Sequence, residues 1–243
     1  IKAIAIGASE VLSELVGVAL AGGPGRACYV PLAHGTGGGL DFASSGPSQM
    51  PRDLALLKLK PLLQDEAVLK IGHDVKHEAH VFLRYGIRIA PFDDVMLLSY
   101  VVEEGVRSHN IVELAEGHLE HKLPADADVL GKGKAQLSFD RLPIADATAY
   151  AAERADATLR LQGLLRPRLA ADKLTTVYET LERPLVPVLA DMEEEGILVD
   201  RDVLARLSQR FAQKMAELEE GIYKLAGEKF NLGSPKQLGD ILF

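Results

Sequence analysis

Cysteine is nearly absent from this sequence, since Cys28 stands alone among 243 residues. A single thiol cannot form a disulfide within the chain, which indicates a protein of the reducing cytoplasm. No apolar run reaches the roughly 18 residues that a membrane-spanning helix needs, so no membrane partner is predicted. The chain begins at Ile1 without a signal-peptide pattern and ends inside an Ile-Leu-Phe run. We therefore expect a cytoplasmic monomer that is a fragment of a longer chain.

Positive charge is also scarce. The chain has 27 Lys and Arg against 35 Asp and Glu, which gives a formal net charge of −8. A purely electrostatic nucleic-acid binder would carry a basic surface, so this class is excluded. A nuclease fold is not excluded, because its metal site is itself built from carboxylates. Also missing are a Gly-x-Ser-x-Gly nucleophile motif, a Cys-x-x-Cys pair and a dinucleotide-binding glycine fingerprint.

What the sequence does contain is a run of strands, followed by strands and helices in alternation. Alternating apolar and β-branched residues predict strands at 1–7, 15–20 and 27–32, joined as an antiparallel meander. After a Gly/Ser-rich loop at 35–51, a further strand is predicted at 67–72. Apolar spacings of three and four predict helices at 51–63, 73–85, 94–102, 111–119 and 145–161. This order is typical of an α/β layered domain with a mixed sheet.

The pattern changes after Pro167. Two long helices with heptad-like apolar spacing are predicted at 174–195 and 202–225. Asp200 ends the short extended turn between them and is placed to cap the second helix. The two helices predict a helical hairpin from a second, incomplete domain. We therefore assign residues 1–171 to the first domain and 172–243 to the start of the second.

Titratable side chains gather at the start of the predicted helix 73–85. His73 and His77 are four residues apart, as are Asp74 and Glu78, and each pair could share a metal ion on one helical face. Solvated polar residues at a helix start explain the same pattern, with Asp74 favoured by the helix dipole. Asp94 begins another helix, where an N-cap is expected.

Two further places carry candidate binding residues. Lys132 and Lys134 lie in a basic Gly-Lys-Gly-Lys tetrapeptide, which suits either contact with phosphate or a solvated turn. Tyr150 and Arg154 are four residues apart on the predicted helix 145–161, so their side chains share one face. An ordinary amphipathic helix would show the same spacing.

In combination these segments resemble the family A DNA polymerases of bacteria. The resemblance covers nearly the whole chain and matches the 3′–5′ exonuclease (proofreading) domain plus the start of the polymerase domain. It implies a ribonuclease H-like, DnaQ-like mixed sheet flanked by helices, followed by the helical hairpin of the polymerase domain. The matching stretches are LVGVALAGGPGRACYVPLAH, LKPLLQDEAVLKIGHDVKHE, FDDVMLLSYVV, LGKGKAQLSF, YAAERADATLRL, ERPLVPVLADMEEEGILVD and FNLGSPKQLGDILF.

Active members of this family use four carboxylates and a tyrosine. The resemblance places an Asp-x-Glu pair on the first strand, an Asp in the segment matching 70–78, and a Tyr-x-x-x-Asp on the helix 145–161. The carboxylates hold two divalent ions, Mg²⁺ or Mn²⁺, roughly 4 Å apart. One ion activates the attacking water and the other stabilises the leaving oxygen, while the tyrosine orients the water.

Most of this set is missing from the chain. The first strand has no Asp-x-Glu, and Glu10 is its only nearby acid. The Asp of the second motif falls at Glu78, and the tyrosine of the third is kept as Tyr150. Arg154 stands where the third motif should have Asp, and its permanent positive charge repels a divalent ion. Asp156 cannot substitute, because it lies roughly 200° away around the helix.

The resemblance and these substitutions together predict an exonuclease fold without proofreading activity and without a bound metal cofactor. Glu78 and Arg154 are expected to form an ion pair across the former site. Such a domain would serve as a structural or DNA-positioning module in DNA replication and repair. Its partners would be the rest of the polymerase chain and DNA, as a single-stranded 3′ end or a primer-template.

Two readings of the site stay open. In the first, Lys132, Lys134 and Arg154 contact DNA phosphates weakly, with a strong dependence on salt. Base stacking would add little, because aromatic residues make up only 5% of the chain. In the alternative, the domain is an active metal-dependent exonuclease with a non-standard carboxylate set, namely Glu10, Asp74, Glu78 and Asp94.

Overall fold

The computed structural model describes residues 1–7, 9, 11–35, 48–103, 108–133 and 136–243. These form two compact units, Ile1–Glu195 and Gly196–Phe243. The first unit extends past residue 171, where the sequence places the domain boundary, because helix α8 (Arg183–Glu195) packs on α2 (Val75–Leu83). In the part of the chain that the structure describes, no helix has the length and apolar character to cross a bilayer.

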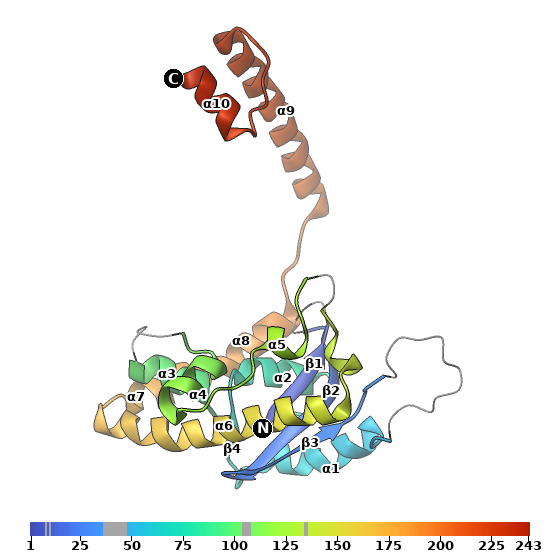
Figure 1. The fold of residues 1–243 in the computed structure, drawn as a ribbon, viewed down its shortest axis with the longest axis vertical. Coiled ribbons are helices and arrows are strands. Elements are labelled where there is room, and N and C mark those ends of the chain that lie inside the picture. Colours follow the sequence, from blue (N-terminus) through green and yellow to red (C-terminus); the bar gives the residue numbers. More distant parts are fainter. Residues whose placement is uncertain (8, 10, 36–47, 104–107, 134–135) are drawn as a thin grey trace. The chain divides into compact units, whose positions relative to one another are not determined.

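The strands of the first unit fall into an antiparallel and a parallel group (Figure 1). They are β1 (Lys2–Ile6), β2 (Glu14–Gly23), β3 (Arg26–Pro31), β4 (Lys70–Gly72) and β5 (Phe92–Asp94). The antiparallel meander of β1, β2 and β3 confirms the sequence prediction. β4 and β5 pair in parallel, and the nitrogen of Ile1 donates a hydrogen bond to the carbonyl oxygen of Ile71 at 2.6 Å. The start of β1 therefore lies beside β4, which makes the arrangement mixed.

The helices of the first unit include every one predicted from apolar spacing. They are α1 (Arg52–Gln64), α2 (Val75–Leu83), α3 (Val95–Glu103), α4 (Ile111–Leu119), α5 (Asp126–Val129), α6 (Ile144–Ala171), α7 (Thr175–Val177) and α8 (Arg183–Glu195), with a 3₁₀ turn η2 (Phe139–Arg141) and a π-helical turn η3 (Tyr178–Glu182). Helix α6 is longer than predicted. It continues through Pro167, because a proline near the end of a helix removes only one backbone hydrogen bond.

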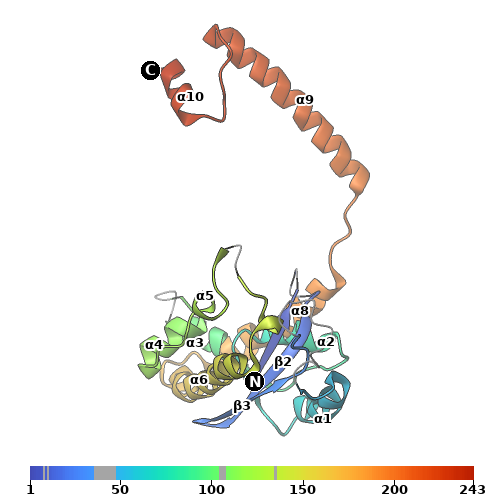
Figure 2. The same ribbon diagram turned by 45° about the vertical axis from the view of Figure 1, so that its right-hand side comes forward.

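The antiparallel strands lie between helices on both faces (Figure 2). Side chains alternate between the two faces of a strand, so β1 and β2 supply both layers. One core faces α1 and α2 and contains Ala3, Leu15, Val18, Leu56, Leu63, Val81 and Phe82. The other faces the first half of α6 and contains Ile4, Val16, Ala19, Tyr29, Phe139, Tyr150, Ala151 and Ala155. Gly17 is required in β2, since a Cβ there would overlap the ring of Tyr29.

The second half of α6 packs on α3 and α4 and ends beside a buried polar group. Asp93 of β5 is 1% exposed. Its carboxylate accepts hydrogen bonds from Gln162 Nε2 (2.9 Å), Tyr178 Oη (3.2 Å), Arg183 Nη1 (3.4 Å) and Arg166 Nη1 (3.5 Å). Both arginines also pair with Glu179. We call these six residues the Asp93 cluster.

The second unit contains α9 (Arg201–Ala226) and α10 (Pro235–Leu242). Asp200 caps α9 as predicted, because its Oδ1 accepts from the backbone nitrogens of Asp202 and Val203, both at 2.9 Å. The helix predicted at 202–225 forms as α9, whereas the range 174–195, predicted as one helix, is divided into α7, the π-helical turn η3 and α8, all in the first unit.

Candidate functional site

Tyr150 and Arg154 lie on the same face of α6, as their spacing predicts. The Arg154 guanidinium carbon is 3.5 Å from the centroid of the Tyr150 ring, which is a close cation–π contact. Both residues are buried, at 8% and 4% exposure. The ring of Tyr150 also contacts Phe139, with centroids 5.3 Å apart. The first half of α6 thus presents a fixed phenol and a fixed guanidinium.

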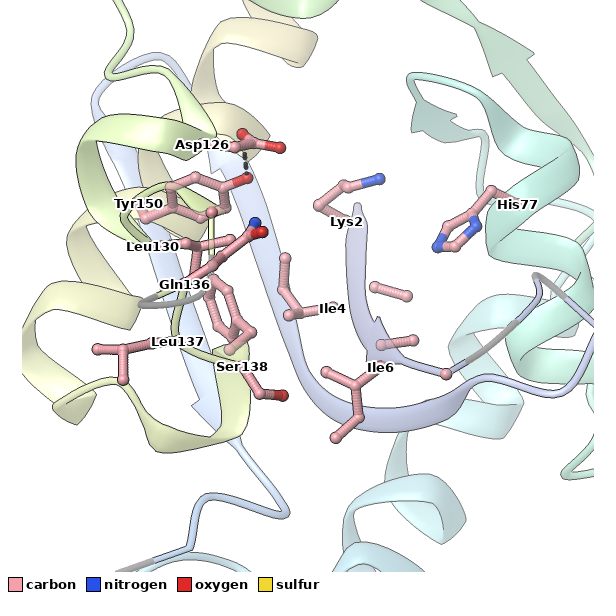
Figure 3. Close-up of a pocket in the computed structure, with 15 residues that line it drawn as sticks. Lys2, Ile4, Ile6, His77, Asp126, Leu130, Gln136, Leu137, Ser138 and Tyr150 are labelled. Atoms are coloured by element: carbon pink, nitrogen blue, oxygen red, sulfur yellow. Dashed lines mark hydrogen bonds between the residues drawn. The ribbon is translucent and has the colours of Figure 1, made fainter. Parts of the chain in front are cut away.

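Asp126 at the start of α5 receives hydrogen bonds from both of these groups. Tyr150 Oη donates to Asp126 Oδ1 at 2.8 Å, and Arg154 Nη2 donates to the same oxygen at 3.0 Å. Figure 3 shows the first of these contacts. Arg154 Nη2 also donates to the carbonyl oxygen of Pro124 at 2.8 Å. The Asp126 side chain is itself 67% exposed, although its partners are buried.

The protonation state of Tyr150 follows from this environment. Burial raises the pKa of its phenol, the charge of Arg154 opposes that shift, and the hydrogen bond to Asp126 adds to it. Tyr150 is therefore protonated at neutral pH and acts as a hydrogen-bond donor.

Glu78 is fully buried on α2 and is bound by the start of β1. Its carboxylate accepts hydrogen bonds from Lys2 Nζ at 2.9 Å and from the backbone nitrogen of Ala3 at 2.5 Å. Burial lowers the pKa of Lys2, but the charge of Glu78 and its hydrogen bond outweigh burial, so the net shift is upward. Lys2 is therefore charged at neutral pH and forms an ion pair with Glu78.

The ion pair predicted between Glu78 and Arg154 is wrong. Each side chain has another partner, Lys2 for Glu78 and Asp126 for Arg154. Sequence reasoning missed both partners, because helical spacing gives no information about a strand or about the loop before α5. Alternation along the first strand does not identify Lys2 as the partner of Glu78 either, since it places Lys2 on the face of Ile4, which packs on α6, whereas Glu78 lies on α2.

Two clefts meet at these residues. The first, about 690 Å³, lies along β1 and is lined by His77, Gln136, Ser138 and the backbone around Ile4. Figure 3 shows Tyr150 and Asp126 on one side of it and Lys2 and His77 on the other. The second, about 500 Å³, is lined by His73, Asn110, Glu113, Arg154 and Thr158. Lys2, Asp126 and Tyr150 line both clefts.

Most of the other candidates are structural groups. Asp94 accepts from the backbone nitrogens of Val75 (2.7 Å), Met96 (2.9 Å) and Asp74 (3.1 Å), so it caps α2 and α3 and confirms the predicted N-cap. Burial raises the pKa of Asp94 to about 6, against the effect of these backbone donors. Asp74 adopts a left-handed conformation with φ of 62° and its side chain caps α2. His73 Nε2 donates to the carbonyl oxygen of His109 at 2.8 Å.

Lys132 is exposed on the loop after α5. Lys134 and Glu10 lie outside the described residues. Asp156 accepts a hydrogen bond from the backbone nitrogen of Gly25 at 2.6 Å. It therefore points at the turn between β2 and β3 rather than at Tyr150, as its position around the helix predicts.

This architecture is that of a ribonuclease H-like exonuclease domain. The sequence model described as 3′–5′ exonuclease matches residues 13–170, and the model of DNA polymerase family A matches residues 201–243. The chain therefore belongs to the 3′–5′ exonuclease family, joined to the start of a family A DNA polymerase. β1, with Lys2, precedes the matched residues.

The relatives of this chain agree with these two family matches. DNA polymerase I of Rhizobium leguminosarum is 52% identical over 242 residues, covering 95% of this chain and 24% of that protein. DNA polymerase I of Pseudomonas aeruginosa is 43% identical over 235 residues, covering 95% of this chain and 25% of that protein. The chain thus spans about a quarter of the length of these relatives.

Two solved structures are similar. The POL domain of Pol1 from M. smegmatis, in complex with DNA primer-template and dNTP, has a TM-score of 0.73 and 26% identity, covering 99% of this chain and 36% of that one. Brucella melitensis NrnC has a TM-score of 0.60 and 19% identity, covering 80% and 84%. At that identity, the likeness to NrnC concerns the fold alone. NrnC has also been solved with bound Mg²⁺.

Proposed function

We propose that this chain is the part of a bacterial DNA polymerase I in which the exonuclease fold has lost nuclease activity and serves as a structural, DNA-positioning module. One observation carries the proposal. Lys2 on β1 and Arg154 on α6 are both positively charged at neutral pH, and they lie on the two elements where active members place three of their four carboxylates. The family match and the polymerase relatives support the context in DNA replication and repair synthesis.

The side chains present do not fit a two-metal site. Within the described ranges, no three His, Cys, Asp or Glu side chains gather closely enough to hold an ion. Glu78 is engaged by Lys2 and Ala3, and Asp126 by Tyr150 and Arg154. A divalent ion beside Glu78 would also have to displace or approach the Lys2 ammonium, which like charge disfavours. We propose that no Mg²⁺ or Mn²⁺ binds here and derive no chemical step through one.

The non-standard carboxylate set is not favoured by the geometry of its members. Both carboxylate oxygens of Asp94 accept hydrogen bonds from backbone nitrogens at the starts of α2 and α3. The side chain of Asp74 caps α2. Neither capping group can turn toward Tyr150 without unwinding a helix end, which would cost about 1 kcal/mol or more. The active-exonuclease reading therefore has weaker support than the positioning role.

The proposed partners are DNA and the remainder of a polymerase chain. The M. smegmatis Pol1 structure holds a DNA primer-template, and NrnC has been solved with the dinucleotide pGG. For this chain we propose contact with a single-stranded 3′ end or a primer-template, with Arg154 and Lys132 as phosphate-contacting residues. We propose that the chain acts in the cytoplasm and forms no homo-oligomer.

A nuclease assay tests the proposal directly. The 243-residue chain is incubated with a 5′-labelled single strand in Mg²⁺ or Mn²⁺, beside an active 3′–5′ exonuclease as positive control. We expect no shortening from the 3′ end. Metal-dependent shortening that disappears in the Glu78→Ala variant would overturn the proposal.

A metal titration tests the observation behind it. Calorimetry with Mn²⁺ should give no binding heat for the native chain. In a double variant, Lys2→Asp with Arg154→Asp, two cations on β1 and α6 become carboxylates, the first of them beside Glu78, and we expect measurable Mn²⁺ binding. Equal binding by both proteins would show that Lys2 and Arg154 do not exclude the ion.

A further inference from the structure

Asp126 is the exposed member of an otherwise buried group. Its side chain is 67% exposed, whereas that of Arg154 is 5% exposed. The helix that carries it, α5, contains no buried residue. Because Arg154 and Tyr150 are buried, Asp126 can leave them at low cost only when another anion takes its place, and α5 has no buried side chain that would hold it there.

The donors that Asp126 receives suit a phosphate group. One carboxylate oxygen accepts both a phenolic O–H and a guanidinium N–H, at 2.8 and 3.0 Å. A guanidinium with a neighbouring hydroxyl donor binds phosphate oxygens in the same way. Arg154 also has an unused hydrogen-bond donor, because its Nη1 is buried and has no hydrogen-bond partner among the described residues.

The charges around the second cleft allow one anion to replace another. Lys2 and Arg154 face three acids, Glu78, Asp126 and Glu113, so moving Asp126 aside leaves two formal positive and two formal negative charges. Glu113, the other acid that lines this cleft, accepts a hydrogen bond from Asn110 Nδ2 at 2.8 Å. The cleft therefore has the size and the donors for an anion that takes the place of Asp126, and this exchange leaves no added negative charge beyond that of the anion itself.

We infer that this cleft is a metal-free phosphate site for single-stranded DNA, and that Asp126 occupies the place of the phosphate until a strand displaces it. The inference rests on the proposed DNA-positioning function and deepens it. Active members hold their substrate at this point through metal ions, whereas in this chain Arg154 and Tyr150 contact the phosphate directly. Asp126 acts as an internal competitor that weakens binding.

The test measures DNA binding without metal. Fluorescence anisotropy of the 243-residue chain with a labelled oligothymidylate, in EDTA, compares Asp126→Asn with the native protein. Removing the competing charge should tighten binding about tenfold, since charge-assisted hydrogen bonds are each worth about that factor. Asp128→Asn is the matched control: it removes the same charge from α5, but the Asp128 carboxylate accepts its hydrogen bond from the backbone nitrogen of Ala125, at 3.2 Å, and not from Tyr150 or Arg154. We expect it to change binding by less than about twofold.

A second pair of variants tests the arginine. Arg154→Met should weaken binding about tenfold, and Arg154→Lys, which keeps the charge but loses the paired donors, should lie between Met and Arg. Inorganic phosphate should compete with the strand in the native protein and lose this effect in Arg154→Met. Circular dichroism confirms that the variants fold. If Arg154→Met does not fold, Arg154→Lys still provides the test.

The outcomes separate this inference from the proposed function. Equal gains in Asp126→Asn and Asp128→Asn would show a general charge effect and overturn the phosphate site. Unchanged binding in both Arg154 variants would overturn it as well. Neither result concerns nuclease activity, which is measured separately by strand shortening in Mg²⁺ and decides the proposed function on its own.

Discussion

The two halves of α6 each hold an arginine against an aspartate, but the surroundings of the two aspartates are opposite. In the first half, Arg154 is buried and Asp126 is exposed on a short helix. In the second half, Asp93 is 1% exposed while Arg166 and Arg183 are about one-third exposed. Asp93 accepts from four side chains on α6, η3 and α8, whereas Asp126 accepts from two.

The difference separates a structural ion pair from an exchangeable one. A buried acid with many donors cannot leave without stranding several charges, so it fixes the elements that surround it. An exposed acid over a buried guanidinium can be replaced by any other anion of similar shape. By this reasoning the Asp93 cluster holds η3 and α8 to the domain, and Asp126 covers a binding site.

Removing Asp93 should have the largest effect. Asp93→Ala leaves Arg166 and Arg183 facing a buried gap and deprives Tyr178 of its acceptor. We expect a loss of about 3 to 4 kcal/mol in the free energy of unfolding, measured by urea denaturation. A loss below about 1 kcal/mol would remove the distinction between the two aspartates.

Asp94 should give the next largest effect, as a dependence on pH. Its folded-state pKa, about 6, exceeds its ordinary value of 3.8, so the native state binds more protons between these values. Asp94 therefore contributes about 2 to 3 kcal/mol to the free energy of unfolding below about pH 4. This contribution is lost as the pH rises through 6.

Urea denaturation at several pH values, on the native protein and on Asp94→Asn, measures this term. Because the variant cannot titrate at this position, its stability relative to the native protein should improve as the pH rises from 4 to 6.5. A constant difference across that range would show that burial does not control this carboxyl.

Replacing Glu78 should have the third largest effect on the free energy of unfolding. It is buried like Asp93 but binds one charged partner, Lys2, and one backbone nitrogen. Glu78→Ala should cost about 2 kcal/mol in urea denaturation, and Glu78→Gln about half of that, because the amide oxygen still accepts from Ala3. If both variants cost the same, the charge of Lys2 contributes everything and the backbone contact nothing.

Asp126 should have the smallest effect on stability. Asp126→Ala leaves the buried guanidinium of Arg154 without its carboxylate, but the place of Asp126 is open to water, so we expect a loss of about 1 kcal/mol in the same denaturation experiment. Asp93→Ala, made in parallel, is the matched comparison at the other end of α6. A large loss for Asp126→Ala would mean that the contact holds the fold, and that α5 does not move freely.

Much of the architecture follows from local patterns. The alternation in 1–32 predicts the meander, apolar spacing predicts the helices, and Asp94 and Asp200 cap the helices that they precede. β5 was missed because three residues, Phe-Asp-Asp, show no period. Helix α5 was missed for the same reason, since it has four residues and buries none.

The contacts of the candidate site could not be predicted in this way. Spacing places Tyr150 and Arg154 on one face of a helix, but it does not say which distant segment meets that face. Asp126 comes from the short helix α5 and Lys2 from β1, so both contacts depend on long-range packing. The proposed loss of carboxylates rests on the residues alone, whereas the partners of Lys2 and Arg154 could be identified only from the fold.

The pairing of Lys2 with Glu78 has a consequence for how this domain depends on its surroundings. A cluster of carboxylates that faces one cleft repels itself unless divalent ions are supplied from solution, and its shape then varies with their concentration. Here the counter-ion is an ammonium group attached to the chain itself. The first unit should therefore melt at the same temperature in a chelator as in millimolar magnesium, a property that suits a rigid spacer better than a metalloenzyme.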